Sequence, residues 1–390
     1  MTWRKRMLFG FAALLVGIVG AYVVVLWNWH RAYKRETQAW LEAGGTLRVE
    51  NLLSEAVADD RNAALLYLEA ADLMPATDDI PEDHASVMDD PGGATLEGLE
   101  AVELAYADVI DLVQIGSRLP DANWPVDYER LIEDQEWLPT TNMRPLVRLL
   151  DVRVALHARR GETNAAVETL LAGLRFADHI DDEPTLLSAL VGAAVEQTML
   201  RSLERHGDGL DLTKTHLTAI ESALAARDAG AITKRALLGE GAFSFAMLDS
   251  AASSVGRVPG ASVWVEFNQA EILRYARAYR DQVDTPFWTI DYAAIEAPSG
   301  TARLAHLLTP SFDSFHRAMV QNERYRRFAE IALGLREFKQ EFGSYPEMID
   351  AVIDPLTGAE IGYERLDEGF RLEAEPVRDG DAFAEWTWER

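Results

Sequence analysis

The strongest pattern along the chain is an uninterrupted apolar run near its N-terminus. Residues Met7 to Trp27 contain no charged side chain, and Arg4, Lys5 and Arg6 precede them. At a rise of about 1.5 Å per residue, about 20 apolar residues cross a hydrocarbon core about 30 Å thick. Tryptophans flank the run at both ends, where interfacial aromatic residues belong. The pattern predicts one helix that contacts the lipid bilayer through Met7 to Trp27.

A cleaved signal peptide is the alternative interpretation of this run. It requires a shorter apolar stretch, roughly 7–15 residues, and a small-residue cleavage site. Here the stretch is longer and is followed by NWHRAYKRE, so we expect an uncleaved anchor. Basic residues lie on both sides, and the free amine adds to the N-terminal side, which favours a cytoplasmic N-terminus by a small margin. We therefore expect a single-pass membrane protein whose soluble domain is extracytoplasmic; in a bacterium this is the inner (cytoplasmic) membrane, with the domain in the periplasm.

Beyond the run, apolar residues recur at steps of three and four over most of the chain, as in amphipathic helices. We expect helices at 60–75, at 95–119, as a series over 142–226, and at 229–250, 265–281 and 311–342. Between them, residues 77–93 read as an acidic loop with proline and glycine, and residues 121–141 as a connector broken by prolines.

The last helix and the tail have the clearest pattern. The helix over 311–342 carries one apolar stripe made by Phe328, Ile331, Leu335, Phe338 and Phe342. Gly343 stands where a C-terminal cap belongs, and Pro346 prevents the helix from continuing. The period then changes to two, so that 361–366 and 369–376 predict a β-hairpin, with a further strand in EWTWER.

These patterns predict a mainly α fold in three parts. Residues 1–35 are the N-terminal transmembrane anchor, and residues 36–310 are an α-helical hairpin or array domain. Residues 311–390 are a C-terminal module in which a small β-hairpin packs on a long helix.

Charge and composition exclude several classes of function. The formal net charge is −27, from 64 acidic and 37 basic residues, and so acidic a surface repels phosphates. We therefore expect no nucleic acid partner. The absence of cysteine excludes disulfides, thiolate metal sites and cysteine nucleophiles.

A search for reaction chemistry finds no zinc-protease, P-loop, dinucleotide-binding or nucleophile-elbow motif. The eight histidines include no pair at the i, i+4 spacing of a helical metal site. The densest ligand-like cluster, Asp78 to Asp90 with His84, could hold calcium, but a solvated acidic loop is favoured. We predict no catalytic, cofactor-binding or metal-binding residue and no cofactor. A group of aromatics could line a groove or form core: Phe287, Trp288, Tyr292, Trp264 and Phe267.

Parts of the helical region resemble the second helix of a tetratricopeptide unit. Ala63, Tyr67, Ala70 and Pro75 fall at its small, aromatic, small and proline positions, but no 34-residue period runs through the chain. Generic packing of helical hairpins explains the same residues equally well.

The C-terminal third resembles a group of uncharacterised bacterial membrane-anchored proteins with a helix–GxYP–DPxTG–hairpin ending. The matching structural motif comprises Gly343, Tyr345, Pro346, Asp354, Pro355, Thr357, Gly358, Tyr363, Gly369 and Phe370. The ending is also similar to the C-terminal region of type II secretion pseudopilins. Pseudopilins need a glutamate within the apolar run, which residues 8–16 lack, so incorporation as a pilin subunit is not expected. The resemblance implies architecture and no activity.

Three functions therefore compete at the level of sequence. The leading interpretation is a membrane-tethered, non-enzymatic helical scaffold or interaction protein of the cell envelope with a protein partner. The second is an accessory component of a secretion or pilus-like system. The third is an envelope hydrolase whose carboxylates come from distant segments.

Overall fold

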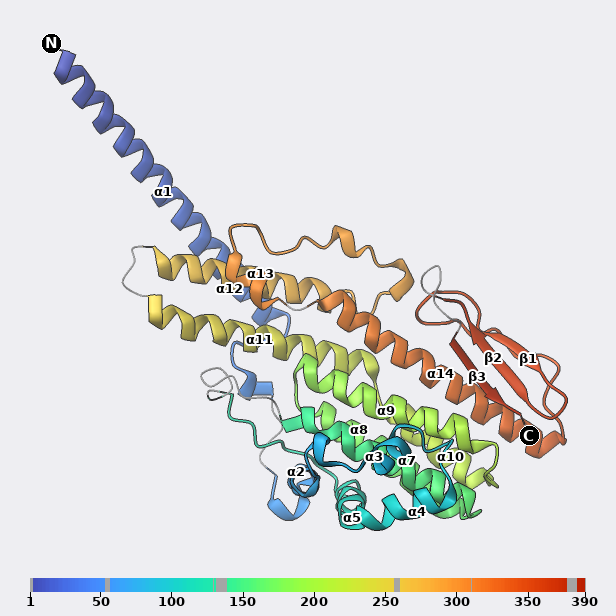
Figure 1. The fold of residues 1–390 in the computed structure, drawn as a ribbon. Helices are drawn as coiled ribbons and strands as arrows, with labels where there is room; N and C mark the ends of the chain where they lie inside the picture. The colour runs from blue at the N-terminus through green and yellow to red at the C-terminus, as the bar shows by residue number, and fades with distance from the viewer. Residues whose placement is uncertain are drawn as a thin grey trace. The chain divides into compact units, whose positions relative to one another are not determined.

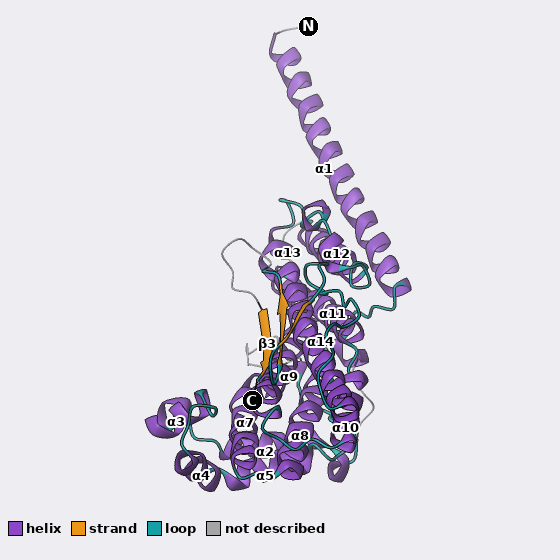
Figure 2. Cartoon of the chain, turned by 90° about the vertical axis from the view of Figure 1, so that its right-hand side faces the viewer, coloured by secondary structure: helices purple, strands orange, loops and turns teal. Residues whose placement is uncertain are grey.

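The structure is a computed structural model. It describes residues 3–52, 57–128, 130, 139–255, 260–309, 311–376 and 384–389. Helices dominate, and a small antiparallel sheet lies near the C-terminus (Figures 1 and 2). The predicted mainly α fold, with a long apolar helix at the N-terminus and a small sheet at the C-terminus, is confirmed.

The chain folds into two compact units that are interleaved in sequence. One comprises Met1–Asn51, Leu237–Asp281 and Asp291–Phe312, and the other comprises Leu52–Ala236, Gln282–Ile290 and Asp313–Arg390. The sequence analysis expected three contiguous parts, 1–35, 36–310 and 311–390, and this division differs from the two interleaved units. Periodicity locates helices, but it does not show which helices pair across long separations, and this is the origin of the difference.

The first unit contains α1 (Trp3–Glu42), the C-terminal part of α11 (Ala229–Val255), α12 (Ala261–Arg280) and α13 (Arg303–Leu308). Helix α1 carries a stretch near the N-terminus that is long and apolar enough to cross a membrane. The far end of α1 is different, because Trp40 there is fully buried and donates from Nε1 to the carbonyl of Thr46 at 2.7 Å.

The second unit is a bundle of helices around one apolar core, together with the sheet. Its helices are α2 (Ala63–Leu73), α3 (Glu82–Asp89), α4 (Leu96–Ala105), α5 (Ala107–Gly116), α7 (Arg144–Arg159), α8 (Thr163–Asp181), α9 (Leu186–Gly207), α10 (Lys214–Ala226) and α14 (Phe312–Phe342), the last of which begins in the first unit. Side chains of Asn62, Thr95, Thr185 and Thr213 cap α2, α4, α9 and α10.

The expected acidic loop over 77–93 is partly wrong, because it contains a 3-10 turn, Thr77–Asp79, and α3. Pro81 precedes α3, and Glu82 and Asp83 occupy its first turn. Negative side chains at that position favour a helix N-terminus, so the acidic residues support the helix that the proline and glycine signals obscured.

The tail forms a three-stranded antiparallel sheet in the order β1 (Gly362–Arg365), β2 (Phe370–Ala374), β3 (Ala384–Trp388). Phe370 pairs with Trp388 and Leu372 with Trp386, and all four side chains are buried. The indole of Trp388 donates to the carbonyl of Glu204 on α9 at 2.9 Å. The third strand and this anchor on α9 give the hairpin the apolar support that two strands alone lack.

The predicted stripe on α14 is correct only in its first part. Phe328 and Leu335 are buried, whereas Phe338 is 36% exposed and Phe342 is 61% exposed. The two exposed rings pack on each other with centroids 4.4 Å apart. The buried face includes Ala332 and Leu333 as well, so it is wider than the predicted stripe.

Candidate functional site

A network of charged side chains lies inside the second unit, between α8, α9, α10 and α14. Glu196, on α9, has no exposed surface. Its carboxylate accepts from Arg326 Nε at 2.9 Å and Nη2 at 3.0 Å, and Arg227 Nε lies 3.0 Å away. Asn322 donates to the same carboxylate. Two guanidinium groups from different segments thus converge on one buried carboxylate.

Asp181, the last residue of α8, joins this network through an ion pair with Arg227. Arg227 also donates to Asp178 at 3.1 Å. Burial raises the pKa of Asp181 to about 8, opposed by Arg227 and reinforced by Glu196 and Asp178. Burial alone would raise the pKa of Glu196, but Arg227 and Arg326 lower it below its usual value. Asp181 is therefore the member of the network that titrates near neutral pH.

A glycine makes room for this carboxylate. A Cβ on Gly192, in α9, would overlap Oδ1 of Asp181 and lie 3.2 Å from the carbonyl oxygen of Ala177. Glycine is unfavourable inside a helix, so its presence in the middle of α9 marks the close approach of α8.

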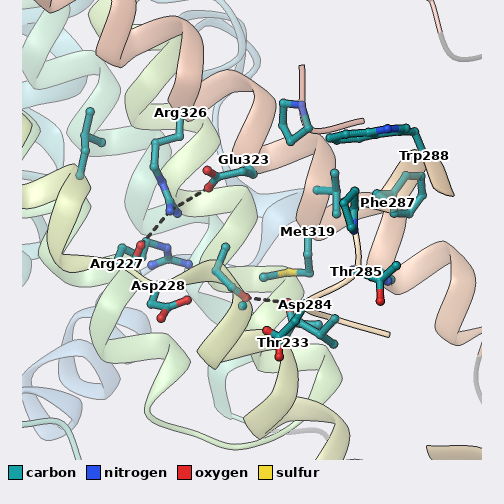
Figure 3. A pocket seen from close by; sticks show the side chains of 18 of the residues that line it. Arg227, Asp228, Thr233, Asp284, Thr285, Phe287, Trp288, Met319, Glu323 and Arg326 are labelled. Atoms are coloured by element: carbon teal, nitrogen blue, oxygen red, sulfur yellow. Dashed lines mark hydrogen bonds and ion pairs between the residues drawn. The ribbon is translucent and has the colours of Figure 1, made fainter. Parts of the chain in front are cut away.

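A pocket of about 580 Å³ opens beside the network (Figure 3). It is formed by the start of α11, the segment 283–288 and one side of α14. The polar and aromatic lining comprises Arg227, Arg326, Asp228, Asp284, Glu323, Glu330, Thr233, Thr285, Phe287, Trp288 and His316. Glu196 and Asp181 do not line it, because the two arginines stand between these buried carboxylates and the open space.

The aromatic wall of the pocket is held firmly. Trp288 is 44% exposed, and its ring lies against Gly358, where a Cβ would meet the indole at 2.6 Å. Phe287 is buried, with the ring of His316 edge-on at 5.4 Å and the guanidinium of Arg317 5.4 Å from its centroid. Trp288 is therefore the half-exposed aromatic side chain of the pocket, whereas Phe287 is packed inside the unit.

The arginines contribute few open donors to the pocket. Arg326 Nη1 donates to the carbonyl of Arg227 at 2.8 Å and to Glu323 at 3.0 Å. Among the lining carboxylates, Asp284 pairs with Lys234, and Asp228 caps the amide of Ala231. Glu323 and Glu330 also pair with Arg327, so each lining carboxylate already has a partner, and the half-exposed Trp288 ring is the element left for a ligand. An aromatic ring beside carboxylates suits a cationic group.

The pocket offers little for covalent or metal chemistry within the described ranges. Thr233 Oγ1 donates to the carbonyl of Ala229 at 2.7 Å, as helical threonines commonly do. Burial lowers the pKa of His316 to about 4, so its imidazole is neutral at pH 7. No group of three or more His, Asp or Glu residues in the described chain is arranged to hold a metal ion.

The first part of the sequence motif builds the junction between α14 and the sheet. Gly343 follows α14 with φ +81°. Tyr345 is buried and contacts Phe370 edge-on at 5.1 Å. Tyr363 donates to the carbonyl of Pro346 at 2.7 Å.

The second part of the motif carries a buried ion pair. Asp354 is 1% exposed and accepts from Arg324 Nε at 2.9 Å and Nη2 at 2.5 Å. Gly358, with φ +76°, closes the turn by donating to the carbonyl of Asp354 at 2.9 Å, and Pro355 lines the pocket. The turn at Asp354 is therefore combined with a salt bridge to α14.

The aromatic group singled out in the sequence divides between the two units. Phe287 and Trp288 belong to the pocket, whereas Trp264, Phe267 and Tyr292 belong to the first unit. Phe267 is buried there, and Tyr292 stacks on Tyr279 at 5.7 Å.

The acidic segment is dispersed rather than clustered. Asp89 pairs with Arg148 at 2.9 Å, Asp90 accepts from the amide of Gly93, and His84 packs edge-on against Tyr106. The turn at 207–212 connects α9 to α10, with Thr213 as the capping residue of α10.

Sequence reasoning missed the charged network, although two signals point to it. Glu196 is a lone carboxylate inside the apolar run LVGAAVEQTML, with Gly192 one turn before it. Arg326 lies on α14 among residues of the core-facing side. A single charge on an apolar helix face requires a buried partner, but sequence does not identify which of the 37 basic or 64 acidic residues supplies it.

No protein-family model, curated protein or solved structure matches the chain. The resemblance of the C-terminal third to uncharacterised membrane-anchored proteins therefore stays a prediction.

Proposed function

We propose that the chain is a membrane-tethered, non-enzymatic scaffold or interaction protein of the bacterial cell envelope. The observation that carries this proposal is α1, which runs without interruption from an exposed apolar stretch into a packed end. None of its most apolar window is buried, whereas Glu36 and Trp40 are. Such a helix inserts its free part into a bilayer while its other end is held in the folded first unit.

The expected location is the inner membrane, with the soluble part outside the cytoplasm. Basic residues and the amino group precede the apolar run, which favours a cytoplasmic N-terminus. The test is fractionation followed by alkaline carbonate extraction of the full chain and of a variant lacking residues 1–27. The full chain should stay with membranes and the variant should not. Recovery of a mature product that lacks the apolar run would overturn the anchor.

The pocket beside Trp288 supports an interaction role. The Trp288 ring is half-exposed, whereas the lining carboxylates Asp284 and Glu323 are already paired with basic side chains. The buried carboxylates of Glu196 and Asp181 do not line the pocket at all. Hydrolysis needs carboxylates that are open to substrate and water, so this arrangement supports binding of a partner's basic side chain on the Trp288 ring more than it supports hydrolysis. The net charge of −27 argues for a basic protein surface as the partner and against nucleic acid.

Photocrosslinking in cells tests this role. A benzophenone amino acid at Trp288, which is 44% exposed, should give a discrete adduct with a protein partner. The matched control is Leu104, which is 82% exposed in the same unit and away from the pocket lining. Equal patterns of adducts at both positions would contradict a specific role for the pocket.

A second candidate is an accessory role in a secretion or pilus-like system. It is supported by the C-terminal module, in which α14, the Asp354 turn and the sheet form one packed structure. The identity of the partner distinguishes this role from the first. A photocrosslinking amino acid at exposed Met348, in the C-terminal module, should form an adduct with a component of such a system if this role is correct.

A further inference from the structure

Helices α1 and α12 run side by side in the same direction within the first unit (Figure 1). Trp29 stacks on Phe267 with centroids 5.1 Å apart. Farther along both helices, Arg277 donates to Glu36 at 2.8 Å. From the first contact to the second, residue numbers increase along both helices. The beginning of α12 therefore lies beside the part of α1 that precedes Trp29.

The beginning of α12 reaches the apolar run itself. Gly260, with φ +81°, precedes α12, and a Cβ there would overlap the phenol of Tyr22 and lie 3.2 Å from Leu26 Cδ2. Both residues belong to the run that ends at Trp27. Five residues separate Tyr22 from Trp27, which is about 7 Å along a helix. Gly260 therefore lies beside α1 at a depth of roughly 2–7 Å inside the end of the span.

Helix α13 lies against the same part of α12. Asn268 Oδ1 accepts from the amides of Leu304 and Ala305 at 3.0 Å each, which fixes the start of α13. Trp264 Nε1 donates at 3.1 Å to the backbone just before α13. Leu307, on α13, is 80% exposed, so this apolar side chain has no protein cover.

We infer that residues 260–264 and 303–308 form a membrane collar, a second contact with the lipid surface beside α1. This inference rests on the proposed anchoring of α1. Gly260, roughly 2–7 Å inside the end of the span, lies at the level at which interfacial helices bury their apolar faces. Helix α13 is fixed on Asn268, the residue after Phe267, so it begins near the level of Trp29, just beyond the end of the span. Trp264 and Trp29 contribute aromatic side chains that favour the interface, and Arg31 stacks over Trp27 at 5.4 Å.

The collar has a mechanical consequence for the anchor. A lone transmembrane helix rotates and tilts freely, whereas a helix held by α12 and by a second lipid contact is fixed in tilt and rotation. The first unit is thereby seated on the bilayer rather than suspended from it.

Site-specific fluorescence tests the collar in the full chain. The chain has no cysteine, so single-cysteine variants need no other change. Ser262, exposed in the first turn of α12, is the reporter, and Glu42, exposed at the far end of α1 in the same unit, is the matched control. Leu15, 52% exposed in the apolar run, reports insertion of α1. Each Ser262→Cys, Glu42→Cys and Leu15→Cys variant carries an environment-sensitive dye and is reconstituted in phosphatidylcholine–phosphatidylglycerol vesicles with nitroxides at a shallow or a deep acyl position.

The expected result is quenching at Ser262 that is stronger from the shallow nitroxide, at least twofold above that at Glu42. Leu15 should be quenched more by the deep nitroxide. Quenching at Leu15 with none at Ser262 above the Glu42 level would overturn the collar and leave the anchor intact. Absence of quenching at Leu15 would overturn the anchor and the collar together.

Discussion

Replacement of Glu196 by glutamine is the most informative perturbation of the second unit. The substitution keeps the size of the side chain and removes its charge. The carboxylate has no exposed surface and lies within 3.0 Å of three guanidinium nitrogens from Arg326 and Arg227. Removal of one partner of a buried ion pair costs about 3–5 kcal/mol, because the remaining charge is left uncompensated.

The expected loss lies at the lower end of this range, about 3 kcal/mol, for two reasons. Glutamine retains one oxygen that accepts from a guanidinium. Loss of the Glu196 charge also removes a repulsion that raises the pKa of Asp181, so Asp181 ionises more readily and replaces part of the missing charge beside Arg227.

Urea unfolding of the full chain in detergent, followed by tryptophan fluorescence and circular dichroism, measures this loss. The control is Glu168→Gln, which breaks the pair with Arg118 whose side chains are 57% and 59% exposed. An exposed pair contributes at most about 1 kcal/mol. The reasoning is refuted if the two glutamine variants unfold at the same urea concentration.

Three further predictions concern packing and titration. Leu335→Ala should lower the free energy of unfolding by about 2–5 kcal/mol, because Leu335 is buried. Phe338→Ala should lower it by less than about 1 kcal/mol, because Phe338 is 36% exposed. Equal melting temperatures of the two variants would contradict the buried face of α14. Gly192→Ala should cost about 1–3 kcal/mol because its methyl group displaces the Asp181 carboxylate, and unchanged unfolding would show that α8 and α9 separate without penalty. The folded pKa of Asp181, about 8, exceeds its unfolded value of 3.8, so its contribution to stability is complete below about pH 4 and is lost as the pH rises through 8. The urea midpoint of Asp181→Asn, relative to the unmodified protein, should therefore rise between pH 5 and pH 9, and a constant difference over that window would refute the assignment.

Local patterns in the sequence predict the elements well, because they depend on neighbours within a few residues. Hydrophobic periodicity and turn chemistry predict the apolar helix, the end of α14 at Gly343 and the strands of the tail. The structure contains all three. Exposure of Phe338 was not predictable, because periodicity does not show where the partner surface of α14 ends.

The pocket and its network were not predictable for a similar reason. Glu196 and Arg326 are 130 residues apart, and Trp288 meets Gly358 across 70 residues, so no local window contains both partners. A lone glutamate in an apolar helix implies a buried cation but does not locate it.

Because the two units are interleaved in sequence, the first unit cannot complete its fold until late in synthesis. Helix α1 leaves the ribosome first, but its packing partner α12 ends at Arg280, more than 230 residues later. At about 5–20 residues per second, roughly 12–50 s pass before α12 exists. During this interval Trp40 and Glu36 have none of their final neighbours from α11 and α12, among them Gly241 and Arg277. With α1 anchored as proposed, a nascent chain stalled before residue 261 would carry an inserted helix whose packing face for α12 is open to chaperones and proteases.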